Sequence, residues 1–205
     1  MRVVDVRWYL DGRSGRAAYE SGHIVGAVWA DTDDDLAGPP SEQGGRHPLP
    51  TPEHFAAAME RLGIDNGDAV VAYDDASGSI AARLWWMLRS VGVEAAVLDG
   101  GLQAWPAPLT TDAPAPRTAR FAPQPWPADA YVDTARVDGL RGDARALLID
   151  ARTAARFRGE DSGGVDRRLG HVPGARSAPW AANVDEATGR LRTADELRAF
   201  FRLVR

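Results

Sequence analysis

The sequence contains no cysteine and no lysine. Without cysteine, these 205 residues cannot form a disulfide, a thiolate metal site or a thiol nucleophile. No apolar run approaches the roughly 20 residues that a membrane-spanning helix needs. The start, MRVVDVRWYL, also lacks the longer apolar stretch of a secretory signal. We therefore expect a cytoplasmic protein without a membrane partner.

The remaining composition is that of an ordinary globular protein. Hydrophobic residues make up 44% of the chain and charged residues 26%. All 24 basic residues are arginine, which we attribute to genome base content rather than to a binding function. The net charge of −5 disfavours a nucleic-acid partner. The length is sufficient for one large domain or two small ones.

Three features of the sequence each occur twice. They are an apolar strand ending in Asp-x-Arg, the pattern Gly-His-(Ile/Val)-x-Gly-Ala, and a threonine that opens a helix. The paired positions are Asp5 and Asp150, Gly22 and Gly170, and Thr51 and Thr193. Their order is the same and their separations, 145, 148 and 142 residues, are nearly constant. The sequence therefore predicts two copies of one module.

A proline-rich segment separates the two copies. The segment from Trp105 to Pro127 contains seven prolines, a density that blocks helices and strand ladders and favours a stiff extended chain. We predict a first domain over residues 1–108, a linker over 109–128 and a second domain over 129–205. We also expect contact between the two copies.

Strands and helices alternate in the first copy. We predict strands over 3–6, after 26, over 69–73 and over 95–98, and helices from Thr51, over 80–91 and just before Trp105. In the second copy, a short strand and a helix over 131–140 precede a strand that starts at Leu147. This alternation indicates an α/β fold with a mainly parallel sheet covered on both faces.

The loop Tyr73-Asp74-Asp75-Ala76-Ser77-Gly78-Ser79 has the most functional content. It joins a strand directly to a helix, so several backbone N–H groups and the helix N-terminus should converge on one point. Such a cradle stabilises an anion, which can be a phosphate, a thiolate or a carboxylate.

Together these motifs resemble the tandem-domain rhodanese sulfurtransferases, which include the thiosulfate and 3-mercaptopyruvate sulfurtransferases. The matching segments are 45–50, 70–74, 81–89 and 97–105 in the first copy, and 150–152, 156–159 and 170–175 in the second. The resemblance implies two rhodanese-like domains, each with strand order 1-5-4-2-3 and a cradle loop after strand 4. In the family, a cysteine in the second cradle takes sulfur from a donor as a persulfide and passes it to cyanide or a thiol.

The resemblance places Asp75 at the nucleophile position of the first copy, which is then a non-catalytic copy. We expect the carboxylate of Asp75 to cap the helix and to fill the cradle. An aspartyl nucleophile of the phosphatase type would need Asp-x-Asp after a strand and a downstream lysine, but here the two acids, Asp74 and Asp75, are adjacent and lysine is absent.

Only 12 residues follow Thr193, whereas 54 lie between Thr51 and the matching end of the first copy at Trp105. By resemblance, we expect the second domain to be incomplete, to lack its cysteine loop, and to belong to a longer parent enzyme of which this chain is a truncated form. We predict that the 205-residue chain transfers no sulfur by itself. The alternative is a non-catalytic rhodanese-like module that binds a partner or a small anion.

Two arginines of the second copy are candidate donor-binding residues by resemblance. Arg156 matches an arginine that the family uses for the charged end of the donor, and Arg168 matches a second one in some mercaptopyruvate-type members. The fixed fork of guanidinium donors suits a small anion. The competing interpretation for each is a solvated arginine or an ion-pair partner. We expect no catalytic residue, metal or cofactor in the chain, and a small anionic sulfur donor as the partner of the longer parent.

Several other polar and aromatic residues are interpreted as structural. His23 and His171 occupy matched positions in both copies, which favours a role such as bonding a loop carbonyl. The acidic run Asp31–Asp35 lacks the spacing and the glycine of an EF-hand. Trp85 and Trp86 lie on an apolar helix and are interpreted as core or interdomain contacts.

Overall fold

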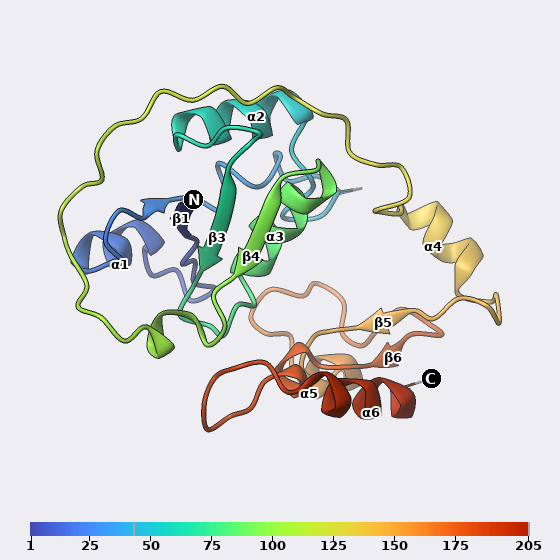
Figure 1. The fold of residues 1–205 in the computed structure, drawn as a ribbon. Helices are drawn as coiled ribbons and strands as arrows, with labels where there is room; N and C mark the ends of the chain where they lie inside the picture. The colour runs from blue at the N-terminus through green and yellow to red at the C-terminus, as the bar shows by residue number, and fades with distance from the viewer. Residues whose placement is uncertain (43, 205) are drawn as a thin grey trace. The chain divides into compact units, whose positions relative to one another are not determined.

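The computed structural model describes residues 1–42 and 44–204. The chain divides into two compact units, Met1–Ala130 and Tyr131–Arg205, which we call unit 1 and unit 2 (Figure 1). None of the helices in the described ranges has the length and apolar character needed to cross a bilayer.

Unit 1 is an α/β unit built on one parallel sheet. Its elements are β1 (Arg2–Asp5), α1 (Gly15–Ser21), β2 (Val28–Trp29), α2 (Pro52–Arg61), β3 (Ala69–Tyr73), α3 (Ala81–Ser90), β4 (Glu94–Val97) and the 3-10 helix η1 (Gly101–Ala104). The strands lie in the order β2-β1-β3-β4 and every pair is parallel. This order matches strands 3-2-4-5 of the pattern that the resemblance implied, and it confirms the expected α/β fold.

Apolar residues cover both faces of the sheet. Successive strand residues point to opposite faces, so Val4 and Ala72 join one cluster while Tyr73 joins the other. Helices α2 and α3 supply most of the larger cluster, including Phe55, Met59, Leu84, Met87 and Leu88, all of which are buried. Figure 1 shows α3 beside β3 and β4. The predicted start of α2 is confirmed, because the Thr51 hydroxyl accepts from the His54 amide at 3.2 Å.

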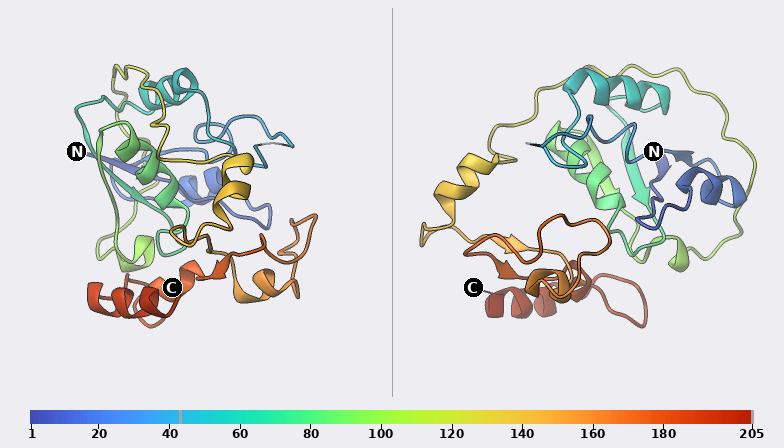
Figure 2. Two further views of the ribbon diagram at one scale, coloured as in Figure 1. Left: turned by 90° about the vertical axis from the view of Figure 1, so that its right-hand side faces the viewer. Right: turned by 180° about the vertical axis from the view of Figure 1, so that it is seen from behind.

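The proline-rich segment packs on unit 1 and is not a free linker. Figures 1 and 2 show it curving around the outside of unit 1, past α1 and α2. Phe121 is buried against Phe55, with ring centroids 5.7 Å apart. The indole N–H of Trp126 donates to the Pro50 carbonyl at 2.7 Å, and its ring stacks on Trp86. Proline excludes regular structure here, but these two aromatic side chains attach the segment to the core.

Unit 2 contains α4 (Thr134–Leu140), β5 (Ile149–Asp150), α5 (Ala154–Arg158), β6 (Arg176–Ser177), the 3-10 helix η2 (Trp180–Asn183) and α6 (Ala194–Val204). Strands β5 and β6 form a parallel pair. The short strand that we expected before α4 does not form, since Tyr131 and Val132 are irregular. No strand among the described residues lies beside them to complete a ladder, and an unpaired strand is not stable by itself.

Candidate functional site

The cradle of unit 1 is filled by the carboxylate of Asp74. Its Oδ1 accepts from the amides of Ala76 and Gly78, and its Oδ2 accepts from those of Ile80 and Ala81, all at 2.8 Å. The residue has no exposed surface. Four amides from the loop and from the start of α3 therefore converge on one carboxylate, as the loop sequence predicts for a cradle.

Asp75, which we predicted to fill the cradle, lies outside it, so that prediction is wrong by one residue. Its carboxylate accepts a hydrogen bond from the Tyr9 hydroxyl at 2.7 Å. The reason is geometric, because adjacent side chains at a strand end point in opposite directions. Burial, with a further contribution from the hydrogen bond to Asp75, raises the pKa of Tyr9 to about 12.

The Asp-x-Arg motif makes the same contacts in both units. Each arginine donates to the carboxylate two residues before it and to the carbonyl of the glycine in Gly-His. The residues are Asp5, Arg7 and Gly22 in unit 1, and Asp150, Arg152 and Gly170 in unit 2. The arginine–glycine distance is 2.7 Å in both. The motif therefore ties the end of a strand to the start of the Gly-His loop.

The two matched histidines also have equivalent surroundings. Nδ1 of His23 lies 2.9 Å from the Tyr19 carbonyl, and Nδ1 of His171 lies 2.7 Å from the Phe157 carbonyl. Each imidazole stacks on the ring of that same aromatic residue, with centroids 3.9 and 3.7 Å apart. Both histidines therefore bond a backbone carbonyl, as a structural role requires, but that carbonyl belongs to helix α1 or α5 and not to a loop.

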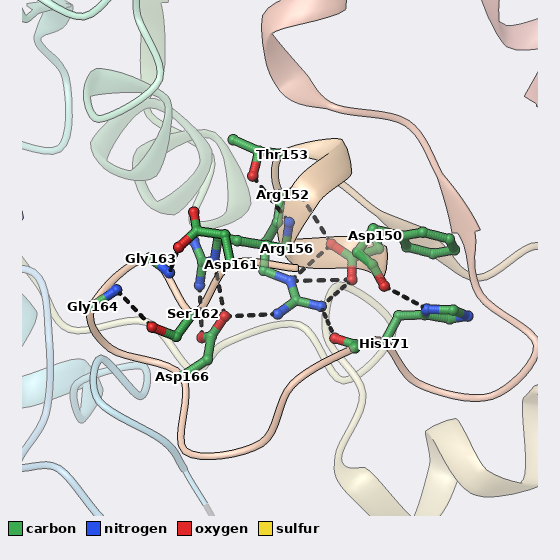
Figure 3. Close-up of polar contacts among 12 residues, drawn as sticks. Asp150, Arg152, Thr153, Arg156, Asp161, Ser162, Gly163, Gly164, Asp166 and His171 are labelled. Carbon is green, nitrogen blue, oxygen red and sulfur yellow. Dashed lines mark hydrogen bonds and ion pairs between the residues drawn. The ribbon is translucent and has the colours of Figure 1, made fainter. Parts of the chain in front are cut away.

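Unit 2 differs from unit 1 by a segment over 160–169, inserted between α5 and Gly-His. In unit 1, Gly22 follows the last residue of α1 directly. Figure 3 shows Asp166 of this segment beside two arginines. Its carboxylate accepts from Arg156 Nε at 2.8 Å and Nη2 at 2.7 Å, and it lies 3.0 Å from Arg152 Nη1. The hydrogen bonds from Arg156 are the main reason that the pKa of Asp166 is lowered.

A cavity of about 650 Å³ opens beside β5. Arg168 lines this cavity together with Arg152 and His171. The Arg168 side chain is exposed and forms no hydrogen bond or ion pair with another residue of the described ranges. Arg156 is not part of the lining. The structure therefore does not bring the two predicted donor-binding arginines to one place, since Arg156 is paired with Asp166 and Arg168 is at the cavity.

Sequence reasoning missed Asp74 as the cradle carboxylate and Asp166 as the partner of Arg156. For Asp74 the signal was present, because it directly follows the last residue of the predicted strand. For Asp166 there was none, because the 160–169 segment contains three acidic residues and nothing in its spacing distinguishes one of them. Within residues 1–42 and 44–204, no three acidic or histidine side chains come together as a metal site would need.

Comparison with known proteins adds to this geometry. The rhodanese-like domain family matches residues 1–107. The chain is 38% identical over 206 residues to a probable 3-mercaptopyruvate sulfurtransferase of Pseudomonas aeruginosa, a match that covers 97% of this chain and 72% of that protein. The chain belongs to the rhodanese-like family. Its relatives include the 3-mercaptopyruvate sulfurtransferase of Escherichia coli, 37% identical over 215 residues, covering 98% of this chain and 72% of that protein.

Other relatives of this rhodanese-like chain give the same result. A putative thiosulfate sulfurtransferase of Mycobacterium tuberculosis, SseB, is 37% identical over 188 residues, which are 86% of this chain and 63% of that protein. Among solved structures, the crystal structure of SseA from Escherichia coli, a 3-mercaptopyruvate sulfotransferase by its description, superposes with a TM-score of 0.84 at 34% identity. That superposition covers 99% of this chain and 77% of SseA.

Proposed function

We propose that the protein acts in sulfur transfer and that unit 2 binds a small anionic sulfur donor, thiosulfate or 3-mercaptopyruvate. The observation that carries the proposal is Arg168, an exposed cation without a partner in the described ranges, which lines the cavity beside β5. The names of the relatives support the same class of donor. Arg156 is a second donor-binding residue in this proposal, provided that the donor displaces Asp166.

The reaction of the family needs a thiolate. The thiolate attacks the sulfane sulfur of thiosulfate, the sulfur–sulfur bond breaks, and sulfite leaves with the bonding electron pair. Cyanide or a thiol then attacks the outer sulfur of the persulfide and restores the thiolate. These 205 residues contain no thiol, and the carboxylate of Asp74 is buried among four amides. We therefore propose that this polypeptide does not turn over, and that the cysteine belongs to a longer parent protein.

The two units have different roles in this proposal. Residues 1–108 are a non-catalytic rhodanese-like domain with a carboxylate in its cradle. Residues 129–205 are the donor-binding second domain, without strands 4 and 5. The matched contacts of Arg7 and Arg152 support a common origin of the two. The segment over 160–169, which lies between α5 and Gly-His only in unit 2, supports a function of unit 2 that unit 1 does not share.

Calorimetry and an activity assay test this proposal together. We expect thiosulfate to bind the 205-residue protein, and Arg168→Gln to weaken that binding at least fivefold. Arg167→Gln is the matched control, because Arg167 is an exposed neighbour outside the cavity lining. We expect no thiocyanate from thiosulfate and cyanide with any of the three proteins. Thiocyanate formation, or equal thiosulfate binding by the Arg168 and Arg167 variants, would contradict the proposal.

The second possibility is a non-catalytic module that binds an anion through the cradle of unit 1. The geometry does not favour it, because all four amides already donate to Asp74. A second anion in the same place would lie against a buried carboxylate, which is electrostatically unfavourable.

A further inference from the structure

The matched histidines of the two units differ at one ring nitrogen. Nδ1 faces a helix carbonyl in both units. Nε2 of His23 lies 3.1 Å from the carbonyl of Asp112, which belongs to the proline-rich segment. Nε2 of His171 has no hydrogen-bond partner in the described ranges. His23 is therefore held between two carbonyl oxygens, whereas His171 contacts one.

The two contacts of His23 require two N–H donors. A carbonyl oxygen only accepts hydrogen bonds, and neutral imidazole carries one N–H group whereas imidazolium carries two. In the neutral form, one ring nitrogen would point its lone pair at a carbonyl oxygen 2.9 or 3.1 Å away. The residue is only 1% exposed, so bulk water does not supply the missing donor. The observed contacts are therefore those of the imidazolium form.

The surroundings of His23 suit a cation. Its ring stacks on the ring of Tyr19 with centroids 3.9 Å apart, and a cation over an aromatic face is stabilised. The titratable and charged groups on the neighbouring elements are Arg16, Tyr19 and Glu20 of α1, Asp5 and Arg7 at the end of β1, Tyr73 of β3, and Asp112. With both tyrosines neutral, these two arginines and three carboxylates leave one negative charge, which an imidazolium balances.

The contact to Asp112 belongs to a small cluster of bonds between His23 and residues 110–112, which we call the clasp. The His23 amide donates to the Thr110 carbonyl and the Thr110 amide donates to the His23 carbonyl, both at 2.9 Å. The Asp112 amide donates to the Thr110 hydroxyl at 3.0 Å. The clasp therefore fastens the proline-rich segment to the Gly-His loop of unit 1.

The clasp can open without disturbing the rest of the proline-rich segment. Beyond it, residues 113–116 form no hydrogen bond with any other described residue. The next attachment is Arg117, which pairs with Asp65 and Asp68. A change at residues 110–112 is therefore absorbed before Arg117, and the aromatic contacts of Phe121 and Trp126 are kept.

We propose that His23 is a pH-dependent switch that closes the clasp when its imidazole takes up a proton. When the proton on Nε2 leaves, the Asp112 carbonyl loses its donor and faces a lone pair, so residues 110–112 move away. The bond exists only in the charged form, so the clasp is tight at low pH and loosens as the pH rises. Histidine changes its charge between about pH 5 and 8, which gives the range of the switch. The inference does not depend on sulfur transfer.

Imidazole nitrogen NMR of the 205-residue protein tests the first step. At about pH 5.5 both ring nitrogens of His23 should be protonated, and at about pH 8.5 Nε2 should have lost its proton. The variants His23→Gln and His171→Gln assign the two sets of resonances. A His23 ring with one unprotonated nitrogen at about pH 5.5 would overturn the proposal.

A nitroxide label on the segment tests the second step. Thr111 is exposed within the clasp, and the chain has no cysteine, so Thr111→Cys gives a single attachment site. The label should tumble about twofold faster or more at about pH 8.5 than at about pH 5.5. A label at Ala187→Cys, an exposed position of unit 2, is the control and should show no change.

Histidine variants of the labelled protein show which ring is responsible. His171→Gln should leave the pH dependence at Thr111→Cys intact, whereas His23→Gln should remove it, because glutamine does not change its charge. Equal label mobility at both pH values would overturn the proposal, and so would loss of the pH dependence in His171→Gln. If His23→Gln does not fold, these two outcomes and the NMR measurement still decide.

Discussion

Asp166 receives two hydrogen bonds from the guanidinium of Arg156, at 2.8 and 2.7 Å, in a side-on pair. The same carboxylate lies 3.0 Å from Arg152, which is itself bound to Asp150. Two arginines and two aspartates therefore sum to zero charge in this part of unit 2. A donor anion that used Arg156 would have to compete with Asp166, while Arg168 at the cavity has no such competitor in the described ranges.

Replacing Asp166 with Asn is expected to strengthen thiosulfate binding about fivefold at low salt, because the cluster changes from neutral to a net charge of +1. The gain should fall as ionic strength rises, since added salt screens exposed charges. Calorimetry at two salt concentrations measures both effects. Asp138→Asn removes a carboxylate of an exposed ion pair on α4 and serves as the control. Weaker binding by the Asp166 variant would instead show that Asp166 holds Arg156 in place for the donor.

The assignment of the cradle carboxylate predicts unequal effects for two adjacent residues. Asp74→Ala leaves four amides, one buried and three partly buried, without their acceptor and should destabilise unit 1 by about 3 kcal/mol. Asp75→Ala removes one hydrogen bond to Tyr9 and should cost about 1 kcal/mol. Urea unfolding followed by tryptophan fluorescence reports mainly on unit 1, which contains six of the seven tryptophans. Equal losses of unfolding free energy in the two variants would contradict the assignment of Asp74 as the cradle carboxylate.

The same pair of positions gives a test of the cradle as an anion site. Because the chain has no cysteine, a single introduced thiol can be titrated without background at 240 nm. The thiol of Asp74→Cys should have a pKa at least one unit below about 8.5, since four amides and the start of α3 stabilise a thiolate. The thiol of Asp75→Cys, outside the cradle, should titrate close to 8.5. If the two titrations coincide, the amides do not stabilise a thiolate.

Tyr9 predicts how stability depends on pH in the alkaline range. Burial and the hydrogen bond to Asp75 raise its pKa to about 12, above the ordinary value of about 10. The neutral phenol therefore stabilises the fold below about pH 10, and this contribution is lost as the pH rises towards 12. We expect Tyr9→Phe to be slightly less stable at neutral pH and to lose less stability between pH 10 and 12. Unfolding measured across that range checks the slope, and an unchanged slope would contradict the prediction.

Strong local signals explain which parts of the fold could be predicted from the sequence. The β-branched run before Tyr73 gave β3 with its observed bounds, and Thr51 followed by proline gave the start of α2. The motifs Asp-x-Arg and Gly-His each occur twice in the sequence, and this repeat predicted that the two copies share a local structure. The structure shows the same arginine–glycine contact in both copies.

The parts that could not be predicted depend on the direction in which a side chain points and on contacts between separate elements of the chain. Periodicity placed two acidic residues after β3 but did not show which side chain turns towards α3. The pairing of Asp166 with Arg156 joins a loop to a helix ten residues earlier, and no local pattern encodes it. Proline content predicted an irregular segment correctly, but it gave no sign that Phe121 and Trp126 would bury their rings against unit 1.

The attachment of that segment has a practical consequence for dividing the protein. A shorter protein that ended near residue 108, at the limit of the matched family domain, would lose Phe121 and Trp126. The aromatic surfaces of Phe55 and Trp86 would then face water, and such a product should self-associate or precipitate. Expression of residues 1–130 keeps those rings covered, so this longer segment is the one to purify when the first unit is studied in isolation.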